Sequence, residues 1–275
     1  MQQVMVHGVA LFVWLAGFIF LLFSFSLRKF QFLAVAYILI FLFLLQMNGK
    51  NYYLFGAYPM LFAAGGYAFQ KLLKTANNGL RAAVVILFTL PNLLILPIVL
   101  PVLPIKQTLA VFKFTQKNLP FLSFATRWED QQQHATTQDY GDMFGWDEMA
   151  ALAAKAYHDM PDTVKQHTRI FAENYGQAGA LHLLGKKYNL PEVVSLSSSF
   201  ALWAPQHIMS RYLIYVADSE DEVKELLPFI AGYKLIGTVQ NTLAREKGTG
   251  VYLLMHPAPS LNQRYQKDLA ETRRK

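Results

Sequence analysis

The first 128 residues contain no aspartate or glutamate, whereas all 18 acidic residues of the chain lie at or after Glu129. Six basic residues precede Ile105, and the remaining 19 follow it. Apolar runs dominate the acid-free part, and runs of this kind span bilayers. We therefore expect a membrane-embedded region followed by a water-exposed one. The basic residues of the first region then report membrane orientation rather than nucleic-acid binding.

Four apolar runs divide the first 104 residues, and each is expected to form a transmembrane helix. Residues 4–26 carry no charge over 23 positions, and a bilayer needs about 20. A secretory signal peptide is the alternative for this run, but its usual basic start is missing from "MQQVMVHG". The other runs are residues 30–46, 54–69 and 82–103, the last with prolines that favour a kinked membrane helix.

The loops between these runs differ in charge, and this difference predicts their side of the membrane. The second loop holds only Lys50. The basic residues of the first and third loops are Arg28, Lys29, Lys71, Lys74 and Arg81. Because short loops rich in Lys and Arg stay cytoplasmic, the second loop and everything after residue 103 are expected outside. The expected location is the inner (plasma) membrane, multi-pass, with a periplasmic C-terminal domain.

From Trp146 onward, strand and helix patterns alternate, which predicts a soluble α/β domain of three layers. Strands are expected at 170–172, 192–197, 211–218, 233–240 and 250–257, and Gly185 is expected to end a helix that begins near residue 176. The expected organisation is a transmembrane helical region (1–104), an irregular linker (105–145), the α/β domain (146–260) and a solvated tail (261–275).

Several chemistries lack their usual sequence signals. The chain has no cysteine, which excludes a disulfide framework and a zinc–thiolate site. Its seven histidines show no metal-ligand spacing, so no metal site is predicted. "SLSSSFALWAP" lacks the G-x-S-x-G of a nucleophile elbow and is interpreted as a polar turn before a packed Trp203.

The stretch "ENYGQAGAL" follows a predicted strand and opens a predicted helix. Glu173, Asn174 and Tyr175 fall at the carboxyl end of that strand, where open α/β sheets bind ligands. We therefore retain these three residues as a ligand-binding candidate in the soluble domain. Gly176 and Gly179 are interpreted first as close helix–sheet packing positions, with anion binding at the helix start as the alternative.

The stretch "GKNYYLFGAYPMLFAAGG" places Lys50, Tyr52 and Tyr53 at the expected outer boundary of the membrane. One interpretation is an aromatic belt with a lysine that reaches to the interface. The other is a cation that meets an anionic lipid headgroup, because a lysine binds phosphate as a point charge. The residues alone leave both interpretations open.

This stretch resembles the G-K-x-Y-Y-L-x-x-A-Y-P segment of bacterial membrane glycosyltransferases of family 39. That family includes protein O-mannosyltransferases and the lipid A aminoarabinose transferase. "FGWDEMAALAAKAYHDMP", "IFAENYGQAGALHLLGKKYNLP" and "FALWAP" follow in the same order as in the C-terminal soluble domain of many bacterial members. The resemblance covers about residues 40 to 255.

The resemblance implies a transferase that uses a polyprenyl-phosphate sugar donor at the outer face of the membrane. Lys50 would approach the donor phosphate, and Tyr52, Tyr53 and Tyr58 would belong to the donor and lipid site. Membrane lipid and the sugar donor are the implied partners, and nucleic acid is not one. The sugar, the acceptor and the lipid length are not specified by these residues.

Two departures from the family pattern bear on activity. Ser197, Ser198 and Ser199 stand where members usually carry "HNS". The family's catalytic carboxylates lie in the first outer loop, and a transferase needs such a group as a general base or as a ligand for a divalent metal. We therefore expect a C-terminal portion whose missing N-terminal half supplies that group. The alternative is a non-catalytic, membrane-tethered domain that binds glycans or a partner.

Overall fold

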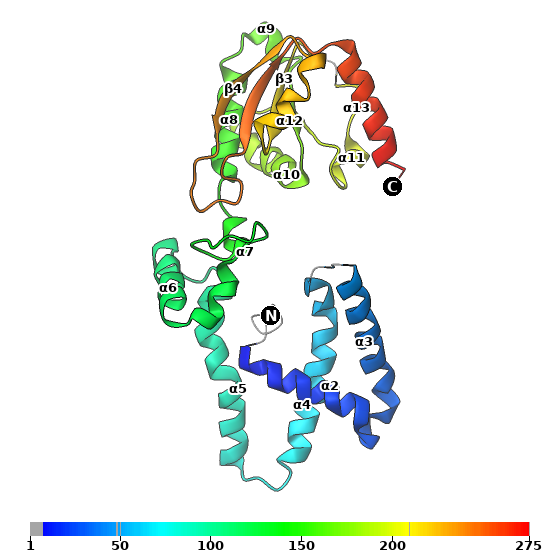
Figure 1. Cartoon of the computed structure of the whole chain (residues 1–275), viewed down its shortest axis with the longest axis vertical. Coiled ribbons are helices and arrows are strands. Elements are labelled where there is room, and N and C mark those ends of the chain that lie inside the picture. The colour runs from blue at the N-terminus through cyan, green and yellow to red at the C-terminus, as the bar shows by residue number, and fades with distance from the viewer. Residues whose placement is uncertain (1–7, 48, 50, 209, 275) are drawn as a thin grey trace. The chain divides into compact units, whose positions relative to one another are not determined.

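The computed structural model describes residues 8–47, 49, 51–208 and 210–274, and the chain forms two compact units, Met1–Arg127 and Trp128–Lys275 (Figure 1). The first unit is helical throughout its described part, and the second contains a sheet. The segments of the first unit are η1 (Gly8–Ala10), α2 (Leu11–Phe23), η2 (Phe25–Phe30), α3 (Gln31–Gln46), η3 (Asn51–Ala57), α4 (Tyr58–Leu72), α5 (Asn78–Val99), α6 (Ile105–Asn118) and η4 (Pro120–Thr126).

Two helices among the described residues are long and apolar enough to cross a membrane. They are Phe25–Gln46, which joins η2 to α3, and Asn78–Val99, which is α5. Each has 22 residues, and very little of either is buried within the protein. Pro91 and Pro97 lie inside α5, as the predicted proline-containing span requires.

The expectation of about four spanning helices is not met, because the other two apolar runs form shorter helices. The helix α2 has 13 residues and α4 has 15, which correspond to about 20 and 23 Å against a hydrocarbon core of about 30 Å. Ser24 adopts an extended backbone that ends α2, and Pro59 marks the first turn of α4. Residues 4–7 of the first predicted run lie outside the described residues.

Glycines set the contact between α2 and α4. A Cβ atom on Gly17 would lie 1.9 Å from the carbonyl oxygen of Leu61, and one on Gly65 would lie 2.0 Å from that of Val13. Both helices therefore approach backbone to backbone. Such contacts through small residues are typical of helices that associate within a bilayer.

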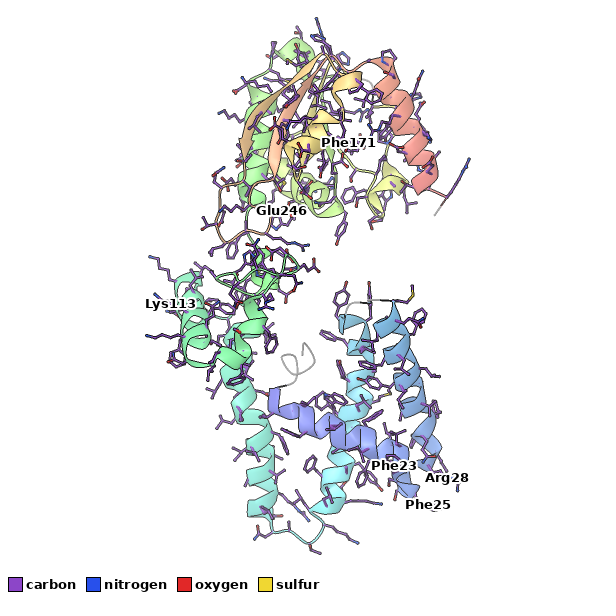
Figure 2. All side chains as sticks on the ribbon, in the orientation of Figure 1. Phe23, Phe25, Arg28, Lys113, Phe171 and Glu246 are labelled. Carbon is purple, nitrogen blue, oxygen red and sulfur yellow. The ribbon has the colours of Figure 1, made fainter. Side chains whose placement is uncertain are left out.

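Basic residues of the two connections α2–α3 and α4–α5 meet where η2 approaches the end of α4. The Lys71 ammonium donates a hydrogen bond to the hydroxyl of Ser26, which joins these two segments. Arg81 donates to the carbonyl oxygens of Leu73 and Lys74, across the turn between α4 and α5. Arg28, labelled in Figure 2, lies at the end of the unit where the chain turns from α2 into α3.

The second unit is built on a five-stranded mixed sheet. The strand order is β2 (Val193–Val194), β1 (Arg169–Ala172), β3 (Tyr212–Ala217), β5 (Gly250–Met255) and β4 (Gly232–Thr238). The pairs β1–β2 and β1–β3 are parallel, and β5 is antiparallel to both of its neighbours. These positions agree with the five predicted strands to within a few residues at each end.

Helices cover both faces of this sheet and give the three layers that the sequence predicts. The helical segments are α7 (Gln138–Gly141), α8 (Trp146–His158), α9 (Asp162–Lys165), α10 (Tyr175–Leu184), η5 (Gly185–Tyr188), α11 (Phe200–Trp203), α12 (Glu220–Lys224), η6 (Leu227–Phe229) and α13 (Pro259–Thr272). Figure 1 shows α8 and α13 on opposite sides of the sheet. One apolar cluster joins the sheet to α8 and α10, and another joins it to α11, α12 and α13.

The strand residues alternate between these clusters, as a period of two requires. Ile214 and Val216 face α8, whereas Leu213 and Tyr215 face α13. A sheet buried on both faces reads as a continuous apolar run, which explains the pattern of "YLIYVA".

Two expected boundaries differ from the structure. Residues 261–275 were expected as a solvated tail, but Leu261, Tyr265 and Leu269 of α13 are buried against the sheet. The spacing of these three residues, four positions apart, places them on one helical face. Residues 105–145 were expected as an irregular linker, but α6 fills 14 of them, with Phe112 buried on it.

The helix α10 ends at Leu184 with Gly185 as its C-cap, as expected, but the left-handed residue comes four positions later. Gly185 keeps a right-handed backbone and begins η5, whereas Asn189 adopts the left-handed conformation with a φ of 51°. Asparagine is one of the few residues besides glycine that tolerates this region. Leu190 packs against Gly185, which explains the glycine at that position.

Candidate functional site

The segment η3 carries the tyrosines that the sequence places at the outer membrane boundary. Tyr52 and Tyr53 are 53% and 59% exposed, and their ring centroids lie 4.7 Å apart in an edge-on arrangement. Lys50 lies outside the described residues. Two exposed aromatic rings on a short helical turn fit either an aromatic belt or a lipid contact.

Tyr58 occupies a different environment from these two tyrosines. It stands in the first turn of α4 and is only 6% exposed, in the apolar cluster that joins α2, α3 and α4. Its ring lies 6.2 Å from the ring of Trp14 and 5.9 Å from that of Phe55. The structure therefore brings Tyr52 and Tyr53 together and places Tyr58 in the interior of the helices.

The three residues predicted at the end of β1 have three separate environments. Asn174 precedes α10, and its side-chain oxygen accepts a hydrogen bond of 2.9 Å from the backbone N–H of Gln177, so it caps the helix. Tyr175 is 63% exposed on the first turn. Glu173 turns toward β3, where it accepts a hydrogen bond from the hydroxyl of Tyr215.

The Glu173 carboxylate lies at the rim of a pocket that we call the α13 pocket. It has a volume of about 210 Å³ and lies between strands β1 and β3, the helix α13 and the segment around α12. Burial raises the pKa of Glu173 above its ordinary value of 4.5, because the Tyr215 bond and Arg264 only partly offset the loss of water. Burial also raises the pKa of Tyr215 far above 10, with the neighbouring Glu173 carboxylate adding to the effect.

A second group of carboxylates lies beside this pocket, at the same edge of the sheet. Gln177 is fully buried, and its amide donates to Asp218 Oδ1 at 2.5 Å and to Glu246 Oε2 at 3.2 Å. The Thr249 hydroxyl also donates to Glu246, at 3.1 Å. Glu246, labelled in Figure 2, lies in the connection between β4 and β5. Burial raises its pKa, although these hydrogen bonds favour the charged form.

The order of the strands explains why these groups meet. The chain passes from β1 outward to β2 and then returns to β3 on the other side of β1, so the carboxyl ends of β1 and β3 are adjacent. Open α/β sheets bind ligands at such a point. Sequence analysis found Glu173 but missed Asp218, Glu222 and Arg264. Asp218 directly follows the predicted strand "RYLIYVA". Its position at the end of a strand could therefore have identified it as a candidate site residue.

The second unit contains a larger cavity of about 440 Å³ around Trp128. The Trp128 and His134 rings stack 3.6 Å apart, and His134 Nε2 lies 2.8 Å from Asp130 Oδ2. Arg245 on its wall forms ion pairs of 3.1 Å with Glu129 and 3.2 Å with Asp142. Arg245, Glu129 and Asp130 at this cavity are therefore already paired with other side chains of the protein.

The serine-rich segment and its tryptophan differ from the sequence interpretation. Ser198 has a left-handed backbone with a φ of 55°, which agrees with a turn. Trp203 is not packed, because 71% of its surface is exposed. Within the described part of the chain, no three His, Asp or Glu residues are arranged to hold a metal ion.

Comparison with known proteins identifies no relative, since no protein-family model, curated protein or solved structure matches the chain.

Proposed function

We propose that this chain is the C-terminal part of an integral-membrane glycosyltransferase that uses a polyprenyl-phosphate sugar donor at the outer face of the inner membrane. The observation that carries the proposal is the segment "GKNYYLFGAYP", which resembles a donor-site segment of glycosyltransferase family 39. Its exposed pair, Tyr52 and Tyr53, stands on the connection between the apolar helices α3 and α4. A lipid-linked donor would reach such a connection from within the bilayer.

The proposed topology has four membrane segments, with η3 and the whole second unit outside. The bond between Lys71 and Ser26 supports it, because it joins the two basic connections that the positive-inside rule assigns to the cytoplasm. The backbone contact at Gly17 and Gly65 supports a place for the short helices α2 and α4 inside the bilayer, since packing through glycine needs no water-driven burial.

The chain needs a further membrane segment for catalysis under this proposal. Transfer to a hydroxyl or an amine requires a general base or a carboxylate-bound metal, and the first 128 residues contain no carboxylate side chain. Donor binding is therefore the function assigned to the present chain, and catalysis is assigned to its combination with a segment that carries Asp or Glu in an outer loop.

Donor binding can be tested on the chain in detergent with a polyprenyl phosphate and the uncharged polyprenol of the same length. The phosphate form is expected to bind more tightly, because a charge-assisted contact to Lys50 contributes about 1.5–3 kcal/mol. Lys50→Ala should weaken its binding by about tenfold to a hundredfold. Lys74→Ala is the matched control, since Lys74 lies near the opposite, basic connection.

Equal binding of the two lipids, or unchanged binding by Lys50→Ala in a well-expressed protein, would assign Lys50 to simple interfacial anchoring. Tyr53→Phe separates the role of the hydroxyl from that of the ring. A hydroxyl contact with the phosphate is lost in this variant, whereas anchoring by the aromatic ring survives.

The second candidate function is a membrane-tethered binding domain without transfer activity. The α13 pocket favours this alternative, because it is lined by residues of the second unit and contains the carboxyl group of Glu173, whose pKa is raised. The two functions are separable, since the first predicts binding of a polyprenyl phosphate and the second does not.

A further inference from the structure

We propose that the α13 pocket binds a small organic ammonium ion, with the charged nitrogen held by Glu173 and Glu222 and the apolar part lying on the aromatic rings of the sheet. The pocket volume of about 210 Å³ corresponds to about seven water molecules at ~30 Å³ each. A small amine with one ring or a short alkyl chain fits this volume. The inference is independent of the proposed donor site, which lies in the first unit.

The charges of the pocket favour a cation. Four carboxylates line it, from Glu173, Glu222, Glu225 and Asp268, against the single guanidinium of Arg264. Arg264 already lies 3.9 Å from Glu225 and 3.8 Å from Asp268, so it offsets those two. An anionic ligand would meet net negative charge here, which excludes phosphates and carboxylates as ligands.

Glu173 and Glu222 are the two carboxylates that remain without a basic partner among the described residues. Glu173 accepts only from the Tyr215 hydroxyl, and Glu222 Oε2 accepts from the backbone N–H of Asp218 at 3.2 Å. Each therefore keeps an oxygen for a further donor. Burial raises the pKa of both groups, because the charge of Arg264 offsets only part of the lost water at Glu173 and the neighbouring Asp218 carboxylate adds to the effect at Glu222. A further positive charge would lower both pKa values. A bound ammonium ion would supply that charge.

The floor of the pocket is aromatic and apolar. The rings of Phe171 and Tyr215 are stacked 5.7 Å apart at an angle of 6°, and the ring of Tyr265 stands edge-on to Phe171 at 6.3 Å. Phe171, labelled in Figure 2, belongs to the cluster that α13 covers. Aromatic faces attract organic cations, and the effect is stronger when the cation is desolvated. Leu213 and Ile208 extend the floor with alkyl surface, which suits the carbon part of an amine rather than a sugar.

The test uses the full chain in detergent and two fluorinated probes of the same shape, 4-fluorobenzylamine and 4-fluorobenzyl alcohol. The ¹⁹F line broadening of each probe is measured with the unmodified chain and with the double variant Glu173→Gln/Glu222→Gln. The difference between the two is taken as binding at the pocket. This subtraction removes partition of the probes into the micelle. The amine is expected to bind at least about tenfold more tightly than the alcohol, which corresponds to about 1.4 kcal/mol.

The control is Asp221→Asn, which changes a carboxylate on α12 that is 88% exposed and lies outside the pocket. It should bind the amine as the unmodified chain does. If circular dichroism shows that the double variant is unfolded, Glu222→Gln alone replaces it and should weaken amine binding about tenfold. Equal binding of amine and alcohol, no specific binding of the amine, or an unchanged affinity in the glutamine variants would each overturn the proposal.

Discussion

The two units of this chain bury apolar surface in opposite ways. In the sheet unit, side chains such as Ile214 and Leu254 are fully buried between strands and helices. In the helical unit, large apolar side chains face outward, and Phe23 and Leu94 are 79% and 76% exposed. Water would penalise such a surface at about 25 cal/mol per Å². The outward apolar surface agrees with the two helices of the first unit that are long and apolar enough to cross a membrane.

The two units also differ in the groups through which their elements pack. The sheet unit is held by interlocking branched and aromatic side chains in two clusters. In the helical unit, α2 and α4 also share an apolar cluster, but their backbones come into direct contact at Gly17 and Gly65. Lipid tails give helices no hydrophobic reason to associate, so close packing carries more of the energy.

The largest expected effect is in the core of the sheet unit. We expect residues 128–275 to be soluble without detergent and to unfold in one transition, and Leu254→Ala should lower the free energy of unfolding by about 2–5 kcal/mol. Leu254 is fully buried in the cluster under α13. Leu202→Ala, at a leucine that is 65% exposed, is the control and should change stability by less than about 0.5 kcal/mol. If residues 128–275 aggregate without detergent, the sheet unit does not fold by itself in water, and the proposed difference between the two units is wrong.

The next effect concerns the glycine contact of the helical unit. Gly65→Ala in the full chain should lower the melting temperature in detergent, with a cost of about 1–3 kcal/mol, because the new Cβ would lie 2.0 Å from the carbonyl oxygen of Val13. Gly66→Ala is the neighbouring control, since a Cβ there meets no atom within 4 Å. Equal stability of the two variants would show that α2 and α4 do not pack through glycine.

The smallest effect is a pH dependence of the sheet unit. Burial raises the pKa of Glu246 above 4.5, so the folded state holds this proton to higher pH than the unfolded state. The contribution of Glu246 to stability is therefore full below pH 4.5 and is lost as pH rises through the folded pKa. Glu246→Gln should flatten this dependence and raise the melting temperature at pH 7 by about 2–4 °C.

The matched control for this pH dependence is Glu271→Gln, at a side chain that is 58% exposed on α13. Thermal melts of both variants from pH 4 to pH 8 give the comparison. A Glu246→Gln variant whose melting temperature follows pH as steeply as the unmodified chain would contradict the assigned cause.

The elements of the sheet unit could be predicted because their signals are local. "RYLIYVAD" and "GVYLLMHP" are dense in β-branched and aromatic residues, and the structure has β3 and β5 there. The end of α10 at Gly185 was predicted correctly, but the left-handed turn at Asn189 was not, since the side chain of Leu190 packs against Gly185. That packing contact is not visible in the local pattern.

The candidate site was only partly predictable, because it depends on which strands are neighbours. The sequence identified Glu173 from the end of a strand, but its partner Tyr215 lies 42 residues away on β3. The pocket also requires α13, whose polar sequence "NQRYQKDLAETRR" was interpreted as a solvated tail. Three residues on one face suffice to dock this helix, and the sheet they contact is unknown until the fold is known.

The most direct test of the account is the membrane topology of the chain. Reporter fusions after Trp128 and after Asn48 should read as outside, and fusions after Lys29 and Lys74 should read as inside, because the basic connections remain cytoplasmic. This result would place the sheet unit in the periplasm and the exposed tyrosines of η3 at the outer boundary. A cytoplasmic reading after Trp128 would contradict the placement of both units and remove the basis for an outer-face transferase.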